Sequence, residues 1–284
     1  MIDDGSTDDS AALAASFADR GVILQRQTNR GQSAACNVAL QMARGDFIKF
    51  FDADDVLSPE MLASQVQALR LKPGAIAYGE WARFHHAPHE ADFLSRPAWH
   101  DAAPVDWLVE AWQDAQPMMQ CGLYLVPREI LQQSGGWDER LSLINDFEFF
   151  TRVTLASRGI VFTPAARLYY RSGVPGSLSA RKSATAWESA FLSVTTGVSH
   201  LLRVEDSPRT RRVGAAVLQG LVYDMYPNTP GLVKKLEQQI AELGSAGLPP
   251  HGGRGFQVAR RVVGWKAARW LQVWTGKFPR PART

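Results

Sequence analysis

The sequence has 284 residues, of which 45% are hydrophobic and 21% charged, and its formal net charge is +3. This length allows one large domain or two small ones with a substantial core, and no apolar run reaches the ~18 residues of a transmembrane span. The cysteines, Cys36 and Cys121, indicate a reducing compartment without a disulfide framework. Because nothing at the N-terminus resembles a signal peptide, we expect a cytoplasmic protein.

The first half of the chain alternates between strand-like and helix-like segments. Turn residues and short apolar runs predict strands ending at Ile2 and covering 22–26, 46–51 and 75–78, with helices over 8–20, 32–44 and 59–71. This alternation predicts an α/β fold with a largely parallel sheet covered by helices. The residues from 85 to 104 are less regular and contain four histidines, which indicates either a loop over a substrate cleft or, less in keeping with known spacings, a zinc site.

The second half ends in helices. After strands and helices between 105 and 170, residues 185–243 are expected to be helical, 244–255 form a Gly/Pro linker, and 256–276 form a basic amphipathic helix. We expect a sheet domain over 1–182, a helical extension over 183–244, a linker over 245–255 and a basic tail over 256–284. The helix of this tail places apolar residues on one stripe: Phe256, Ala259, Val263, Ala267, Trp270 and Trp274.

Charge is divided unevenly along the chain. Eight basic residues and no acidic one follow position 250, so 23 basic residues face all 28 acidic ones before it. A basic helix with tryptophans suits an anionic membrane surface, whereas the alternative is a helix packed on the body with its arginines in solvent. Nucleic acid is not an expected partner, because the body is acidic.

An acidic cluster follows the strand at 46–51. Asp52 and Asp54 are two positions apart, so in an extended chain they point the same way, with Asp55 turned aside. Paired carboxylates at the carboxyl edge of a sheet suit Mg²⁺ or Mn²⁺ held together with a phosphorylated ligand. The alternative is an acidic loop that caps the helix beginning at Pro59.

Three later segments carry further candidate residues. Gly135-Gly136-Trp137-Asp138-Glu139 is a glycine turn that presents an aromatic ring and two acids. Asp146 lies at the start of an amphipathic helix, where it either complements the helix dipole or acts as a general base. The Gly/Ser/Pro loop that includes Arg171, Ser177 and Arg181 offers groups suited to a diphosphate, or is a solvated connector.

Together these motifs resemble family 2 glycosyltransferases, which have a GT-A (Rossmann-like) fold and use nucleotide-sugars. The resemblance implies that Asp3 and Asp4, in Asp3-Asp4-Gly5-Ser6-Thr7-Asp8, hold the nucleoside, with Arg30 in the same pocket. It implies that Asp52-Ala53-Asp54 is the DxD motif, with Asp52 facing the ribose and the metal held mainly by Asp54, and that Arg171, Ser177 and Arg181 close over the diphosphate. Trp137 and Asp138 would then face the acceptor, and Asp146 would be the catalytic base.

The chain departs from the family pattern in two places. Asn145-Asp146 stands where the family has Glu-Asp, and the closing loop has no histidine that could serve as a further metal ligand. The strand, helix and second strand with which the family normally starts are absent, so we expect either a fragment of a longer protein or a degenerate member.

The resemblance implies an inverting, metal-assisted transfer from a nucleoside-diphosphate sugar, most simply a UDP-sugar, to a saccharide or a lipid-linked acceptor of the cell envelope. Such an enzyme would work at the inner face of the cell membrane. The alternative is a non-catalytic module that binds sugar, nucleotide or protein. A metal-dependent phosphohydrolase using Asp52 and Asp54 fits the acidic cluster but leaves the Asp146 and Ser177 regions without a role.

Overall fold

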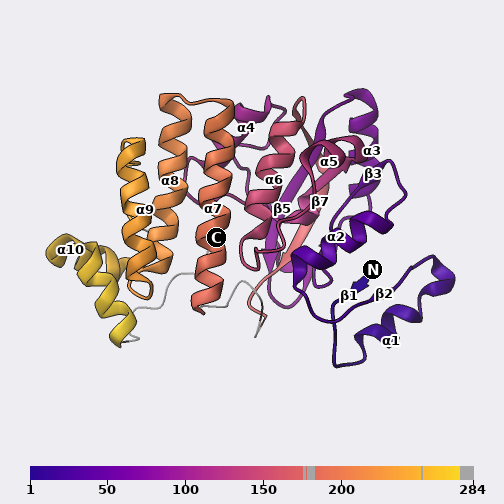
Figure 1. Ribbon diagram of the computed structural model, residues 1–284, viewed down its shortest axis with the longest axis horizontal. Coiled ribbons are helices and arrows are strands. Elements are labelled where there is room, and N and C mark those ends of the chain that lie inside the picture. The colour runs from indigo at the N-terminus through magenta and orange to yellow at the C-terminus, as the bar shows by residue number, and fades with distance from the viewer. Residues whose placement is uncertain (175–176, 178–182, 251, 276–284) are drawn as a thin grey trace.

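The computed structural model describes residues 1–174, 177, 183–250 and 252–275 (Figure 1). The strands are β1 Ile2–Asp3, β2 Gln25–Arg26, β3 Phe47–Ile48, β4 Val56–Leu57, β5 Ile76–Phe84, β6 Tyr124–Pro127 and β7 Ile160–Arg171. The helices are α1 Ser10–Ala15, α2 Gln32–Met42, α3 Met61–Leu71, α4 Pro104–Trp112, α5 Arg128–Ser134, α6 Asn145–Ala156, α7 Ala184–Val204, α8 Pro208–Met225, α9 Pro230–Leu243 and α10 Arg254–Thr275. The expected α/β class is confirmed, and helices flank a central sheet.

The directions of the strands differ from the mostly parallel sheet that we expected. In the described residues the main sheet has the order β3-β6-β5-β7-β4, and β1 pairs with β2 in a separate two-stranded sheet. β5 and β7 run parallel, but β6 is antiparallel to both of its neighbours and β4 is antiparallel to β7. The expectation was wrong for β6, which runs opposite to β3 and β5 on either side of it. A run of apolar residues predicts a strand but does not reveal the direction in which that strand runs.

The two faces of the main sheet are covered by different helices. Successive side chains of a strand point to opposite faces, so Ala77, Leu125 and Val161 lie on one side and pack with Leu69 of α3. The residues of alternate positions face the larger core, which includes α6 and α4: Ile76, Tyr78, Tyr124, Val126 and Ile160. The sheet is therefore buried on both faces.

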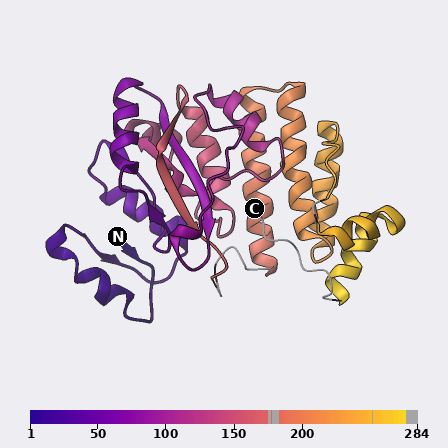
Figure 2. The ribbon, with the colours of Figure 1, turned by 180° about the vertical axis from the view of Figure 1, so that it is seen from behind.

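The helices after residue 183 continue this larger core. One cluster of buried apolar residues extends from Ile48 of β3 through α7 and α8 to Ile240 of α9. Figures 1 and 2 show α7, α8 and α9 side by side next to α6, with α10 at one end of the molecule and the unit of β1, α1 and β2 at the other. The helical extension is therefore packed as part of the body, and the domain boundary that we set at 182/183 stays a proposal about the sequence.

The basic helix α10 bends at Gly264, where φ is +77°. Trp265 packs edge-on against Tyr223 of α8, and Lys266 forms an ion pair with Glu237 of α9. The predicted apolar stripe is divided by this packing: Phe256 is buried, whereas Trp270 and Trp274 remain exposed. No helix of the described residues is long and apolar enough to cross a membrane.

Candidate active site

The acidic cluster after β3 is organised by two glutamine side chains. The Asp52 carboxylate accepts a hydrogen bond from Gln32 Nε2 at 2.8 Å through Oδ1 and one from Gln120 Nε2 at 3.1 Å through Oδ2. The same Gln120 nitrogen donates to Asp55 Oδ2 at 2.7 Å. Asp52 and Asp55 are therefore held side by side, and burial raises the pKa of Asp55 to about 7.

The prediction that Asp52 and Asp54 converge, with Asp55 turned aside, is wrong in this structure. Asp55 is buried and Asp54 is exposed. The reason is that β3 ends at Ile48 and the chain turns, with Asp55 N–H donating to Asp52 O at 3.4 Å, so the alternation of an extended strand does not apply. Arg171 fixes this turn, because its backbone N–H donates to Asp55 Oδ1 at 2.8 Å and its Nε donates to Asp54 O at 2.9 Å.

Gln120 is a site residue that sequence reasoning missed. Its side chain is buried, and its Oε1 accepts from Gly122 N–H at 2.6 Å, so both ends of the amide are used. The available signal was one polar residue inside the apolar run before β6, which does not reveal its partners. Cys121 beside it is buried, and burial raises the pKa of this thiol, as it raises that of Cys36 to about 12. Neither thiol is therefore a ready nucleophile.

Asp146 is the second residue of α6 and belongs to the same electrostatic environment. Burial, followed by the negative charge of Asp52, raises the pKa of Asp146 to about 6, and these effects outweigh the stabilising N–H groups at the helix start. Asn145 beside it donates to Ser33 Oγ at 3.1 Å and to Gln32 Oε1 at 3.3 Å. Asn145 therefore fastens the start of α6 to the start of α2.

The turn at residues 3–7, after β1, also carries acids, and nearby residues bind their carboxylates. Asp4 Oδ1 accepts from Gln27 Nε2 at 2.7 Å and from Arg30 N–H at 2.9 Å, and its Oδ2 accepts from Gly31 N–H at 2.8 Å. Asp3 accepts from Ser6 N–H and from Arg26 Nε, which lowers its pKa. Asp3, Asp4 and the backbone of Arg30 thus lie close together, and their role in a nucleotide pocket stays a prediction.

The glycine turn, residues 135–139, contacts Asn37 of α2 and Arg30 of the loop before α2. Asn37 Oδ1 accepts from Trp137 N–H at 2.7 Å, and a side chain on Gly136 would meet that oxygen at 2.6 Å and displace the Asn37 amide. Arg30 forms an ion pair with Glu139 at 2.9 Å. Asp138 is bound by Arg140, which lowers its pKa.

Trp137 does not offer the exposed platform that we expected. It is only 4% exposed and stacks on Phe149 of α6, with ring centroids 4.0 Å apart and an interplanar angle of 8°. Phe50 meets it edge-on at 5.2 Å. The expectation failed because three aromatic rings form a core beneath the turn, where a large apolar ring gains most by burial.

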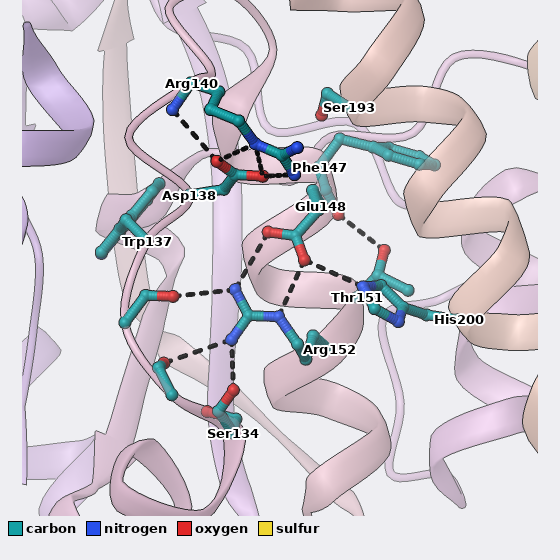
Figure 3. A network of polar contacts seen from close by, with 12 residues as sticks. Ser134, Trp137, Asp138, Arg140, Phe147, Glu148, Thr151, Arg152, Ser193 and His200 are labelled. Carbon is teal, nitrogen blue, oxygen red and sulfur yellow. Dashed lines mark hydrogen bonds and ion pairs between the residues drawn. The ribbon is translucent and has the colours of Figure 1, made fainter.

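A partly buried ion pair on α6 also supports the glycine turn (Figure 3). Arg152 donates to both carboxylate oxygens of Glu148, at 2.8 and 3.0 Å, and also to the carbonyl oxygens of residues 134–136. His200 of α7 lies 2.9 Å from Glu148 Oε1. Burial would raise the pKa of Glu148, but the hydrogen bonds from His200 and Arg152 outweigh it and lower that pKa.

The diphosphate loop is described in part. Arg171 lies at the end of β7 and contacts the turn at residues 52–55. Ser177 N–H donates to Val174 O at 3.2 Å. Arg181 lies outside the described residues. The histidines at 85, 86, 89 and 100 are exposed, and among the described residues no three His, Cys, Asp or Glu side chains gather as metal ligands.

Comparison with known proteins finds a family model that matches the first part of the chain. Residues 1–116 match the model of glycosyl transferase family 2. This part of the chain is therefore similar to glycosyl transferase family 2. The chain is 34% identical over 85 residues to an uncharacterized glycosyltransferase of Haemophilus influenzae. The matched segment is 29% of this chain and 34% of the relative.

A longer match extends beyond the family 2 segment. Beta-monoglucosyldiacylglycerol synthase of Nostoc is 28% identical over 182 residues, or 59% of this chain and 37% of the relative. The matched segments therefore span about a third of these relatives' lengths. S. aureus TarS, solved in complex with UDP-GlcNAc, superposes with a TM-score of 0.68 at 12% identity, covering 98% of this chain and 83% of that one. This likeness confirms the GT-A fold.

Proposed function

We propose that this chain transfers a sugar, with inversion, from a nucleoside-diphosphate donor to an acceptor hydroxyl, and that Asp146 is the general base. One observation carries the proposal. Asp146, the second residue of α6, is close enough to Asp52 that burial and the charge of Asp52 raise its pKa to about 6. A base with this pKa is mostly ionised at neutral pH and still binds a proton well enough to remove it from a hydroxyl during attack.

Asp4 and its turn would bind the nucleoside. A carboxylate has about four acceptor positions, and the three N–H donors from Gln27, Arg30 and Gly31 leave one for a base N–H. The complex of TarS with UDP-GlcNAc supports a UDP-sugar as the first donor to test. Arg171 is placed to share the charge of the diphosphate, together with Ser177 and Arg181 of the following loop.

The carboxylates of the turn at residues 52–55 fit a hard divalent cation. Asp54 is exposed, whereas the oxygens of Asp52 already accept from Gln32 and Gln120. Asp54 would therefore be the principal protein ligand of Mn²⁺ or Mg²⁺ and Asp52 the secondary one, in keeping with a site of one or two carboxylates plus phosphates. When bound, the metal would neutralise charge on the departing diphosphate.

The test is an assay of the purified 284-residue chain with UDP-glucose, UDP-GlcNAc and GDP-mannose, in Mn²⁺, Mg²⁺ or EDTA. We expect metal-dependent donor consumption that Asp146→Asn lowers by about 10²- to 10⁴-fold, while calorimetry shows unchanged nucleotide binding. Glu129→Gln, which changes an exposed acid of α5, is the control and should keep full activity.

Two results would contradict the proposal. Turnover near the wild-type rate in Asp146→Asn would remove Asp146 as the base. A folded wild-type chain that binds nucleotide but consumes no donor under any metal condition would favour the non-catalytic binding module.

The acceptor side of the proposal is a lipid-linked substrate reached from a membrane surface. α10 exposes large apolar side chains next to basic ones: Val258, Val262, Val263, Trp270, Leu271, Val273 and Trp274, with Arg261 and Lys266. Trp270 and Trp274 stack with centroids 5.8 Å apart. This combination of tryptophan and positive charge suits the boundary of an anionic membrane, and the name of the Nostoc relative is that of a synthase of a glucosylated lipid.

Vesicle sedimentation tests this surface. We expect binding to vesicles that contain phosphatidylglycerol, weaker binding in high salt and none to phosphatidylcholine alone. The double variant Trp270→Ser/Trp274→Ser should abolish binding, and Leu71→Ser, at an exposed apolar position of α3, should not. Vesicle binding that survives the double variant, or a stable dimer in solution that the double variant dissociates, would overturn the membrane assignment.

A further inference from the structure

Ile144, the residue before α6, has an unusual backbone conformation. Its φ of 58° and ψ of 26° lie in the left-handed region. A β-branched residue rarely adopts this conformation, and it persists only where the surroundings impose it. Because Ile144 precedes Asp146 by two positions, its backbone sets the direction in which α6 starts and hence where the carboxyl of Asp146 lies.

The groups that hold this segment come from α7. Ser193 Oγ donates to Ile144 O at 2.5 Å, and Ser193 is fully buried. Ser189 Oγ accepts from Ser142 N–H at 2.8 Å and from Leu143 N–H at 2.9 Å, and it donates to Leu143 O at 3.1 Å. Two hydroxyls thus bind the three residues that precede the start of α6, and Ser189 uses its full hydrogen-bonding capacity.

These serines belong to one stripe of α7 that faces the first turns of α6. Residues 189, 193, 197 and 200 are three or four positions apart, so they share a face of the helix. A side chain on Gly197 would meet Phe147 at 2.5 Å, so the two helices are in close contact there. His200 continues the stripe with its contact to Glu148, and Figure 3 shows Ser193 and His200 on the neighbouring helix directed toward α6.

We propose that Ser189 and Ser193 are positioning residues for Asp146, so that α7, outside the family 2 match, is part of the catalytic unit. The role rests on the proposed function. Without the hydroxyls, residues 142–144 would relax toward ordinary backbone conformations and the start of α6 would shift. A misplacement of about 1 Å at a reacting group costs about 10²-fold in rate.

The experiment compares Ser193→Ala and Ser189→Ala/Ser193→Ala with Ser199→Ala, an exposed serine on the same helix. Four quantities are measured: kcat, donor KM, amide hydrogen exchange of residues 142–148, and the melting temperature. We expect kcat to fall about 10- to 100-fold in the double variant, the donor KM to stay within about twofold, and exchange to rise at 142–148. Ser199→Ala should match the wild type in every quantity.

The two proposals can fail separately. If the wild-type chain turns over donor and the double variant keeps its kcat, or if the loss appears in KM or follows the melting temperature alone, the positioning role is overturned while the transferase proposal stands. If the wild-type chain is inactive with every donor, the proposed function fails. In that case unchanged hydrogen exchange at 142–148 in the double variant would also overturn the claim that α7 holds this segment.

Discussion

The junction of α6 and α7 and the N-terminal unit of residues 1–31 are fixed in opposite ways. Phe149 and Phe150 of α6 are completely buried, and α7 binds the segment before them through buried hydroxyls. In the N-terminal unit Leu13 and Ile23 are 63% and 66% exposed, and the turn is closed mainly by the partly exposed Asp4. The position of the candidate base therefore depends on the core. The candidate nucleotide turn, residues 3–7, is instead held by a few polar contacts, a pattern typical of low local stability.

The largest effect should come from the aromatic core beneath the glycine turn. Trp137→Ala removes a ring stacked on Phe149 and should lower the free energy of unfolding by about 3–5 kcal/mol, because it leaves a cavity among buried rings. Leu13→Ala, in the N-terminal unit, should lower it by less than about 0.5 kcal/mol. Urea denaturation measures both, and comparable losses would remove the contrast between the two regions.

The acids of the two regions should respond to pH with opposite sign. The folded chain holds the proton of Asp146 up to a pKa of about 6, above its ordinary value of 3.8, so ionised Asp146 destabilises the fold, and this effect grows as the pH rises from about 4 to 6. Asp146→Asn should therefore raise the stability at pH 7.5 by about 2 kcal/mol and leave it unchanged near pH 3. Asp3, whose pKa is lowered by Ser6 and Arg26, stabilises the fold above its ordinary pKa and loses that contribution as the pH falls.

The control for this prediction is Asp3→Asn. It should lower the melting temperature at pH 7.5 and have no effect at a pH low enough to protonate Asp3 in the folded chain. Thermal unfolding at several pH values between 3 and 7.5 would show the two trends. Equal pH dependence in both variants would contradict the assignment of a raised pKa to Asp146.

The same contrast explains which features the sequence could predict. The expected helices over 32–44 and 59–71 and the amphipathic helix that starts at Asp146 correspond to α2, α3 and α6, because local apolar spacing suffices for them. The order of motifs also led to the family, which the comparison with residues 1–116 bears out. Local sequence patterns therefore predicted the fold class and the places of the candidate residues along the chain.

What could not be predicted depends on distant partners. Asp55, and not Asp54, lies beside Asp52, because Gln120 and the backbone of Arg171 bind Asp55 from 65 and 116 residues away. Trp137 was expected at the surface, but the rings that cover it come from Phe50 and Phe149. No spacing rule near these residues contains that information, since each depends on how strands and helices far apart in the sequence are assembled.

A smaller effect is expected at the nucleotide turn. Asp4→Ala removes three hydrogen-bond acceptor contacts and should weaken UDP binding about tenfold, because a bond to a charged group contributes about 1.5–3 kcal/mol and partial exposure reduces this. Calorimetric titration measures the affinity. Asp9→Ala, an exposed acid in the same unit, is the control. Equal affinity in the two variants would show that the turn does not bind the nucleoside.

The smallest effect concerns the ion pair that joins the two regions. Arg30 and Glu139 lie 2.9 Å apart, but their side chains are 54% and 44% exposed. A double-mutant cycle with Arg30→Gln and Glu139→Gln should therefore give a coupling energy below about 1 kcal/mol, and one that salt weakens. Because Asn37 separately binds the backbone of Trp137, the glycine turn should keep its place without the ion pair. A larger, salt-independent coupling would mean that the nucleotide turn is fixed by the core as firmly as Asp146 is.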